Sequence, residues 1–145
     1  LPPGSTAALN LVNSRARRWQ AQGRLDEADE AWAELHAAYE RTQSRNPAVV
    51  ALLNNRAEVA LARGRRDDAS RWIEQALALS RQLQGDYAQS AITGQTWLIS
   101  ARLALAEGDS QRVREAAQSS LRELRATVGP EHPGLQEAIR LAGAD

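Results

Sequence analysis

The sequence predicts an all-α fold built as a solenoid of three helical hairpins and a closing helix. The first observation is composition, because Ala, Leu, Arg and Glu make up about half of the 145 residues, which is typical of helical arrays. The second is a repeat, in which a helical run, a glycine, an acidic residue and another helical run recur around Gly23, Gly64 and Gly108. These glycines are 41 and 44 residues apart, a period that is typical of solenoids.

Residue size also recurs at fixed distances from the three glycines. Small residues at helix crossings let two backbones approach, and large ones fill the space between ridges. Seven residues before the glycines stand Ala16, Ala57 and Ala101, and eleven before stand Val12, Leu53 and Trp97. Five residues after them stand Ala28, Ala69 and Val113, and nine after stand Trp32, Ile73 and Ala117. The agreement at four positions indicates a true repeat.

The expected elements follow from this pattern. We expect helices at 6–22, 26–43, 48–62, 67–83, 87–106, 109–126 and 133–142. The three repeat glycines suit left-handed helix ends, and Asp26, Asp67 and Asp109 suit N-caps or acidic first turns of the following helices. Pro47 and Pro133 suit opening turns, and the Gly85-Asp86 pair separates the second unit from the third.

We expect one domain over 1–145, with units at 6–43, 48–83 and 87–126 and a capping helix at 133–142. The chain begins Leu-Pro-Pro-Gly-Ser, without an initiating Met. That start reads as the tail of a linker, so we expect the domain to come from a longer polypeptide.

Composition excludes several classes of function. The 18 basic and 18 acidic residues balance, which argues against nucleic-acid binding driven by charge. There is no cysteine and there are two histidines, so we expect no metal site, no cofactor and no catalytic residue. The longest uncharged stretch, 87–101, is too short and polar to cross a membrane. We therefore expect a binding domain rather than an enzyme.

The repeat resembles the tetratricopeptide repeat (TPR), in the longer version typified by kinesin light chain and widespread in bacterial signalling proteins. Three segments carry the resemblance: VNSRARRWQAQGRLDEA at 12–28, LLNNRAEVALARGRRDDA at 52–69, and VGPEHPGLQEAIRLA at 128–142. The resemblance implies a right-handed superhelical array whose first helices line a concave face. It also implies recognition of a protein or peptide, in the regulatory part of a larger bacterial protein such as a Ser/Thr kinase or transcriptional regulator.

The concave face gives a set of candidate peptide-binding residues, because these polar side chains lie off the apolar stripe of each first helix. They are Asn10, Asn13, Arg17 and Gln20 in the first unit, Asn54 and Glu58 in the second, and Gln95 and Arg102 in the third. Asn side chains offer a donor and an acceptor to an extended backbone, and arginines can pair with carboxylates. A solvated helix face would also explain each of them.

Other residues have structural interpretations. We expect the stems of Arg15 and Arg56 to pack while their charges reach second-helix acids such as Glu27 or Asp68. Trp19, Trp32 and Trp97 fall at core positions. Trp72 lies beside the apolar stripe, and the sequence leaves open whether it is half-buried at a unit junction or an exposed contact. His36 and His132 have no cysteine or paired histidine near them, so neither is expected to bind a metal.

The alternative function is self-association. Leu135, Ala138, Ile139 and Leu141 give the 133–142 helix an apolar face that caps its own array or docks on another copy. We expect a monomer with a protein or peptide partner, no nucleic acid and no direct membrane insertion. A cytoplasmic location is expected, or an extracytoplasmic one if the parent is a membrane-spanning kinase.

Overall fold

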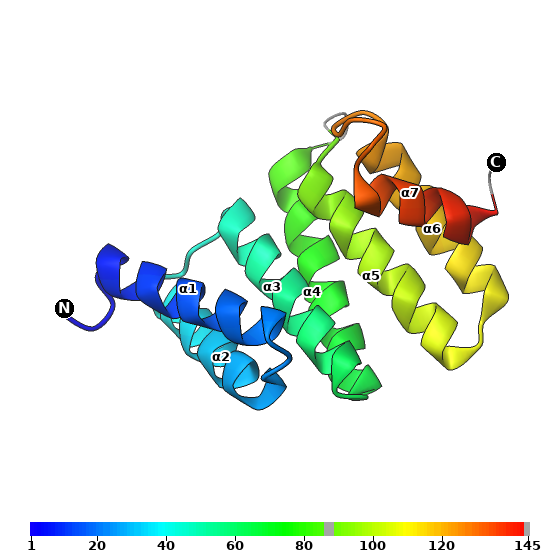
Figure 1. Ribbon diagram of the computed structural model, residues 1–145. Helices are drawn as coiled ribbons and strands as arrows, with labels where there is room; N and C mark the ends of the chain where they lie inside the picture. Colours follow the sequence, from blue (N-terminus) through cyan, green and yellow to red (C-terminus); the bar gives the residue numbers. More distant parts are fainter. Residues whose placement is uncertain (86–88, 144–145) are drawn as a thin grey trace.

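The computed structural model of the protein describes residues 1–85 and 89–143. Over these residues it consists of helices joined by short turns, in the order expected from the repeat (Figure 1). The helices are α1 (Thr6–Ala21), α2 (Leu25–Arg41), α3 (Pro47–Ala62), α4 (Arg66–Gln84), α5 (Ala91–Glu107), α6 (Ser110–Leu124) and α7 (Pro133–Ala142). Six of the seven predicted helices therefore begin and end within two residues of their expected bounds.

The start of α5 is a correction. The sequence predicted this helix from residue 87, whereas it begins at Ala91. The reason is capping: the Ser90 side chain accepts a hydrogen bond from the Thr93 backbone N–H, which satisfies a group that the first helical turn leaves unpaired. The carboxylate of Glu123 on α6 also accepts the Ser90 backbone N–H at 2.7 Å. The predicted Asp86 half of the Gly85-Asp86 break lies outside the described residues.

The repeat glycines end their helices as expected. Gly23, Gly64 and Gly108 have φ of 73°, 75° and 75°, the left-handed conformation in which a Cβ is disfavoured. Asp109 is a true N-cap that accepts the Arg112 N–H. Asp26 instead lies in the first turn of its helix, where its charge complements the helix dipole.

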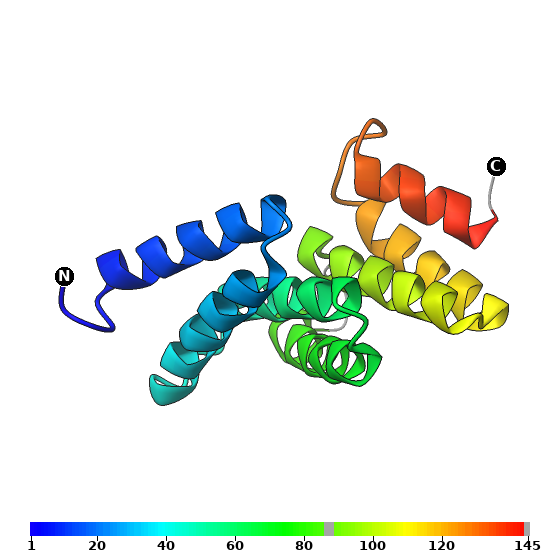
Figure 2. The same cartoon turned by 60° about the horizontal axis from the view of Figure 1, so that its bottom comes forward.

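Helices pair as antiparallel hairpins, α1 with α2, α3 with α4 and α5 with α6, and α7 packs on α6 and α5. The small residues predicted at the crossings are buried: Ala16, Ala57 and Ala101 are each 0% exposed. Figure 2 shows α1 and α7 rising at the two ends of the array, with α3 and α5 between them. The first helices of the units thus share one concave side.

The core is a row of apolar clusters rather than one centre. The cluster around Trp32 joins α1, α2 and α3 through Leu52 and Val59, and the one around Leu98 joins α5, α6 and α7 through Leu135. Trp32 is 1% exposed, and Trp19 and Trp97 are half-buried against these clusters, which confirms the packing role predicted for them. Each hairpin therefore depends on its neighbours for burial, as in other solenoids.

Two close contacts fix the third hairpin. A Cβ built on Gly94 of α5 would lie 2.7 Å from Cγ of Leu124 on α6, so only glycine lets these helices approach so closely. The Ser120 hydroxyl donates to the Gly94 carbonyl at 2.8 Å.

None of the helices in the described ranges, 1–85 and 89–143, is long and apolar enough to cross a membrane.

Candidate binding groove

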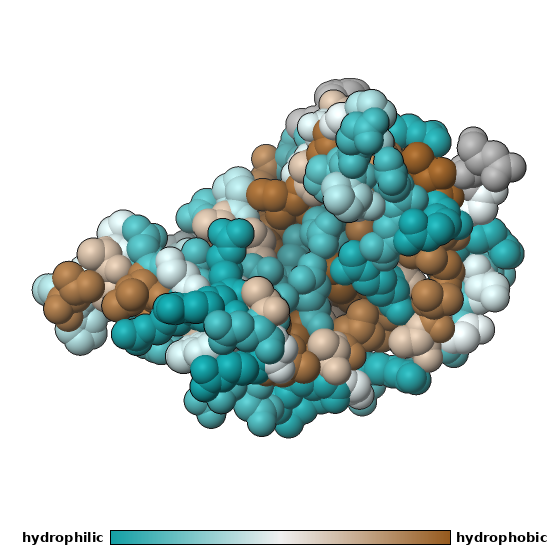
Figure 3. All heavy atoms as spheres, viewed as in Figure 1, coloured by the Kyte–Doolittle hydropathy of each residue, from teal (hydrophilic) through white to brown (hydrophobic). Residues whose placement is uncertain are grey.

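The concave side holds a cavity of about 630 Å³ that is lined mainly by α1, α3 and α5. We call it the groove. The face that contains it is mostly hydrophilic, with smaller hydrophobic areas (Figure 3). Its amide, charged and imidazole side chains are Asn10, Asn13 and Arg17 of α1, Asn54, Asn55 and Glu58 of α3, Gln95 of α5, and His132 of the α6–α7 connection, and Tyr39 of α2 also lines it. Six of the eight residues singled out from the sequence therefore meet in one cavity.

Four of the groove side chains have free polar groups. Asn10 and Arg17 are exposed, and Asn13 and Asn55 are half-buried. Within residues 1–85 and 89–143, no hydrogen bond or ion pair engages the side chains of these four. They belong to the first and second hairpins, so the N-terminal half of the groove presents three unpaired amides and one unpaired guanidinium.

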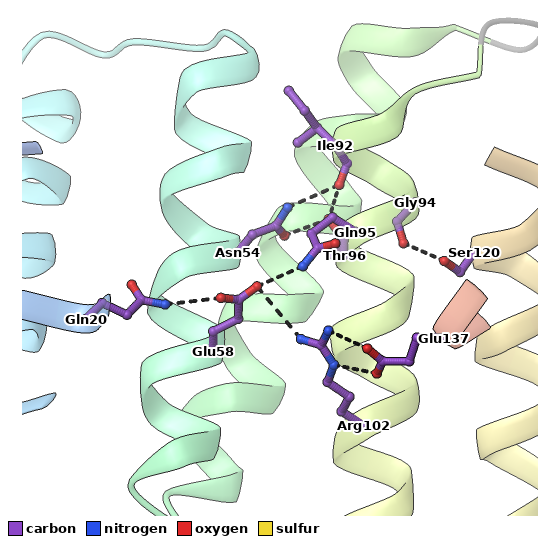
Figure 4. Close-up of polar contacts among 10 residues, drawn as sticks. All are labelled: Gln20, Asn54, Glu58, Ile92, Gly94, Gln95, Thr96, Arg102, Ser120 and Glu137. Carbon is purple, nitrogen blue, oxygen red and sulfur yellow. Dashed lines mark hydrogen bonds and ion pairs between the residues drawn. The ribbon is translucent and has the colours of Figure 1, made fainter. Parts of the chain in front are cut away.

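Asn54 has a different role from its neighbours. It is 5% exposed, and its amide donates to the Ile92 carbonyl at 3.1 Å and accepts from the Thr96 hydroxyl at 2.7 Å. These bonds join α3 to α5 (Figure 4). Asn13 occupies the same repeat position, but the position equivalent to Thr96 is Leu52 in α3. Because Leu52 has no hydroxyl, the Asn13 amide lacks the partner that Asn54 has.

Glu58 is the centre of a polar network that spans the first helices (Figure 4). Its carboxylate accepts from the amide of Gln20 on α1 at 3.1 Å and from that of Gln95 on α5 at 2.8 Å. The Gln20 carbonyl in turn accepts the indole N–H of Trp32 at 2.9 Å. The nearest guanidinium nitrogen of Arg102 is 4.0 Å away. Glu58 therefore ties α1, α3 and α5 together at one end of the groove.

Arg102 continues the network to the last helix. It donates two hydrogen bonds, of 2.7 and 2.8 Å, to the two carboxylate oxygens of Glu137 on α7. This bond raises the pKa of Arg102 and lowers the pKa of Glu137, with burial acting against both shifts. Gln20 and Arg102 thus lie beside the groove and hold first helices together. Peptide contact by any of the eight residues stays a prediction.

Sequence reasoning did not place Asn55, His132 or Glu137 in the groove or its polar network. Asn55 could have been found from the sequence, because it directly follows Asn54. Successive residues of a helix point about 100° apart, so one asparagine of the pair can face the next helix while the other faces the groove. His132 caps α7 by accepting the Gly134 N–H at 3.1 Å. Glu137 had no signal, since its partner is 35 residues away in the chain.

On the outer side, the expected partners of Arg56 were wrong. Arg56 donates to Nδ1 of His36 at 2.9 Å, and its guanidinium lies 4.0 Å from the ring centroid of Trp72. The predicted acids have local partners instead: Glu27 pairs with Arg24, and Asp68 with Arg71. Trp72 is half-buried at the junction of α2, α3 and α4. That settles the question left open by its position in the sequence.

Arg15, whose stem was expected to pack, is exposed.

In the described part of the chain, no group of three His, Asp or Glu side chains is arranged to hold a metal ion.

Comparison with known proteins agrees with this geometry. The profile of the tetratricopeptide repeat family matches residues 8–82. One similar solved structure is BtubC (BKLC) from P. vanneervenii, with a TM-score of 0.75 and 18% identity over 94% of this chain. Another is a Podosopora anserina putative kinesin light chain with nearly identical TPR-like repeats, with a TM-score of 0.70 and 22% identity over 99% of this chain.

The matches cover 57% of the BtubC chain and 71% of the Podosopora chain. A search of the curated proteins finds no match. The two structures share the fold with this chain, in a version like that of kinesin light chain, and the family profile covers more than half of its residues. The chain belongs to the tetratricopeptide repeat family.

Proposed function

We propose that this domain binds an extended segment of a partner protein in the groove. The observation that carries the proposal is the set of free polar groups in the N-terminal half of the groove, Asn10, Asn13, Arg17 and Asn55. An amide side chain can donate to one backbone carbonyl and accept from one backbone N–H, so the three asparagines suit a peptide in extended conformation. Tetratricopeptide repeat domains generally act in protein interaction, which supports the same assignment.

The charge of the groove indicates the kind of segment. α1 contains three arginines and no acidic residue, and none of the three has an ion-pair partner in the described residues. Glu58, the groove acid, already accepts two hydrogen bonds. Arg17 is therefore the charged group that is free to pair with a ligand, and we infer a partner segment that carries a carboxylate.

The proposal is tested with a random dodecapeptide library displayed on phage and selected on the wild-type domain. Selected peptides are then synthesised, and their Kd is measured by calorimetry for wild type, Asn55→Ala and Arg17→Ala. We expect Asn55→Ala to weaken binding by about 5-fold, as for the loss of one neutral hydrogen bond, and Arg17→Ala by about 10-fold or more, as for the loss of a hydrogen bond to a charged group. Glu74→Ala, at an exposed position of α4, is the matched control.

Selected peptides that bind both groove variants as tightly as wild type would contradict the proposal. Loss of binding on Glu74→Ala, with the groove variants unaffected, would place the site on the outer face instead.

The proposal also covers the role of the domain. We infer that it is the partner-sensing part of a larger bacterial signalling protein, such as a Ser/Thr kinase or a transcriptional regulator, on the basis of the repeat resemblance at 52–69. The test is the activity of the parent protein with and without a selected peptide. An unchanged activity at saturating peptide would contradict it.

A further inference from the structure

His36 lies where the first and second hairpins meet. Its ring packs edge-on against Trp72 of α4, with 5.4 Å between ring centroids and 71° between planes. Its Nδ1 is 2.9 Å from a guanidinium nitrogen of Arg56 on α3, and its Nε2 is 3.4 Å from a carboxylate oxygen of Glu40 on α2. This set of side chains, here called the His36 junction, connects α2 to both helices of the second hairpin.

The direction of the Arg56 bond determines the protonation state of the ring. A guanidinium has donors only, so Nδ1 of His36 must accept and must carry no proton. The single proton of the neutral ring then lies on Nε2, facing Glu40. Protonation would place a second donor opposite Arg56 at 2.9 Å and remove its hydrogen bond to His36. Nε of Arg56 is already buried without a partner in the described part of the chain.

The charges around the ring favour the neutral form. Burial and the positive charge of Arg56 lower the pKa of His36, and Glu40 opposes them. The Glu40 side chain is 72% exposed, so water screens its attraction. The other charged groups around the junction are Asp29 of α2, Arg45 of the α2–α3 loop, and Asp68 and Arg71 of α4.

Protons can reach the ring from solvent. A second cavity, of about 810 Å³, lies between α2 and α4 on the outer side, and His36 is one of its lining residues together with Gln75 and Leu79. The His36 side chain is 9% exposed. The ring can therefore exchange protons without unfolding of either hairpin.

Among the described residues, few other polar contacts join the first hairpin to the second. They are the Gln20–Glu58 hydrogen bond and the ion pairs of Arg63 with Asp26 and Asp29, at 2.9 Å each. The hairpin carries three of the free groove residues, so its angle to α3 sets the width of the groove. A change at the His36 junction on the outer side therefore alters the width of the groove on the concave side.

We propose that the His36 junction is a pH-sensitive contact that holds the first hairpin against the second while His36 is neutral and releases it when His36 is protonated. The property belongs to the free domain and is independent of the proposed peptide binding. It makes the width of the groove depend on pH in the range in which histidines titrate.

The first test measures the protonation directly. The chain has two histidines, so nuclear magnetic resonance of their ring protons follows each titration. We expect the pKa of His36 to lie below the ordinary value of 6.5. Arg56→Gln should raise it, because a repelling cation is removed, and Glu40→Gln should lower it further. A pKa of His36 at or above 6.5, or one that Arg56→Gln leaves unchanged, would overturn the proposal.

The second test measures the movement. The domain has no cysteine, so Glu30→Cys on α2 with Gln118→Cys on α6 places a spin-label pair across the junction. Glu74→Cys on α4 with Gln118→Cys is the matched control pair, within the second and third hairpins. From about pH 7.5 to about pH 5 we expect the first distance distribution to broaden and lengthen and the second to stay constant.

The His36→Asn substitution, made in the chain that carries the first spin-label pair, replaces the ring by an amide that can accept from Arg56 but does not titrate. The distance distribution of the first pair should then no longer depend on pH. If His36→Asn fails to fold, Arg56→Gln serves in its place, because a Gln amide oxygen can accept from a protonated Nδ1, so the first pair should lose its response to pH although the ring still titrates. The proposal fails if, with His36 and Arg56 both present, the first pair does not respond while the ring titrates, or if both pairs respond equally.

Discussion

Arg102 of α5 and Glu137 of α7 face each other with both carboxylate oxygens bonded, at 2.7 and 2.8 Å, and so fasten the last helix to the array. The two side chains are 34% and 23% exposed, which limits the value of the pair to about 0.5–1 kcal/mol. We expect Glu137→Gln to lower the free energy of urea unfolding by that amount. Glu107→Gln, which breaks the exposed pair with Arg112, should have a smaller effect. Equal losses would contradict this.

The same pair gives a pH dependence. The pKa of Glu137 lies below its ordinary value of 4.5 in the folded protein, so the unfolded chain takes up the proton first on acidification. The contribution of Glu137 to stability is therefore complete above pH 4.5 and is lost as the pH falls through the folded pKa. The difference in unfolding free energy between wild type and Glu137→Gln should shrink on acidification. A difference in unfolding free energy that grows below pH 4.5 would contradict this prediction.

Asn54 and Asn13 occupy one repeat position but should respond differently to substitution. Asn54→Ala removes two bonds between α3 and α5 and leaves buried groups with fewer partners, so we expect a loss of about 1–3 kcal/mol in urea unfolding. Asn13→Ala removes a free amide and should change stability by less than about 0.5 kcal/mol. A similar cost for both variants would show that the Asn54 bonds add little.

Gly94→Ala should destabilise the third hairpin. The added methyl group would overlap Leu124, which is 2% exposed and cannot move aside without displacing the core. Overpacking lowers the free energy of unfolding by about 1–3 kcal/mol, and the higher helix propensity of Ala raises it by about 1 kcal/mol. We expect a lower Tm by calorimetry. Gly129→Ala has open space around the new methyl group, so its Tm should match or exceed that of wild type.

The fold was predictable because it is periodic. Residues repeated around Gly23, Gly64 and Gly108 indicated which faces are buried, and local capping rules then gave the helix ends. The start of α5 was missed because the Ser90 cap lies within a polar stretch that has no hydrophobic period. In such a stretch, the Ser90 cap and the contact of Ser90 with Glu123, 33 residues away, show where the helix begins.

The groove was less predictable than the fold. Helical spacing places a side chain on a face, and that was enough to bring Asn13, Arg17 and Gln95 to one cavity. It does not show which polar groups are already satisfied. Whether an amide is free depends on single residues of the next unit, as the contrast between Thr96 and Leu52 shows. The same limit explains why the partners of Arg56 were mispredicted. The expected acids, Glu27 and Asp68, pair with arginines that are closer to them in the sequence.

The division between bonded and free amides has a consequence for the size of a ligand. The second and third hairpins are joined through Asn54, whereas the free side chains Asn13 and Asn55 belong to different hairpins on either side of the first junction. A segment that contacts both must reach across the junction between the first and second hairpins, and a shorter one that lies on the first hairpin alone makes no hydrogen bond with Asn55. In the proposed binding mode, the groove therefore discriminates between ligands by their length as well as by their charge.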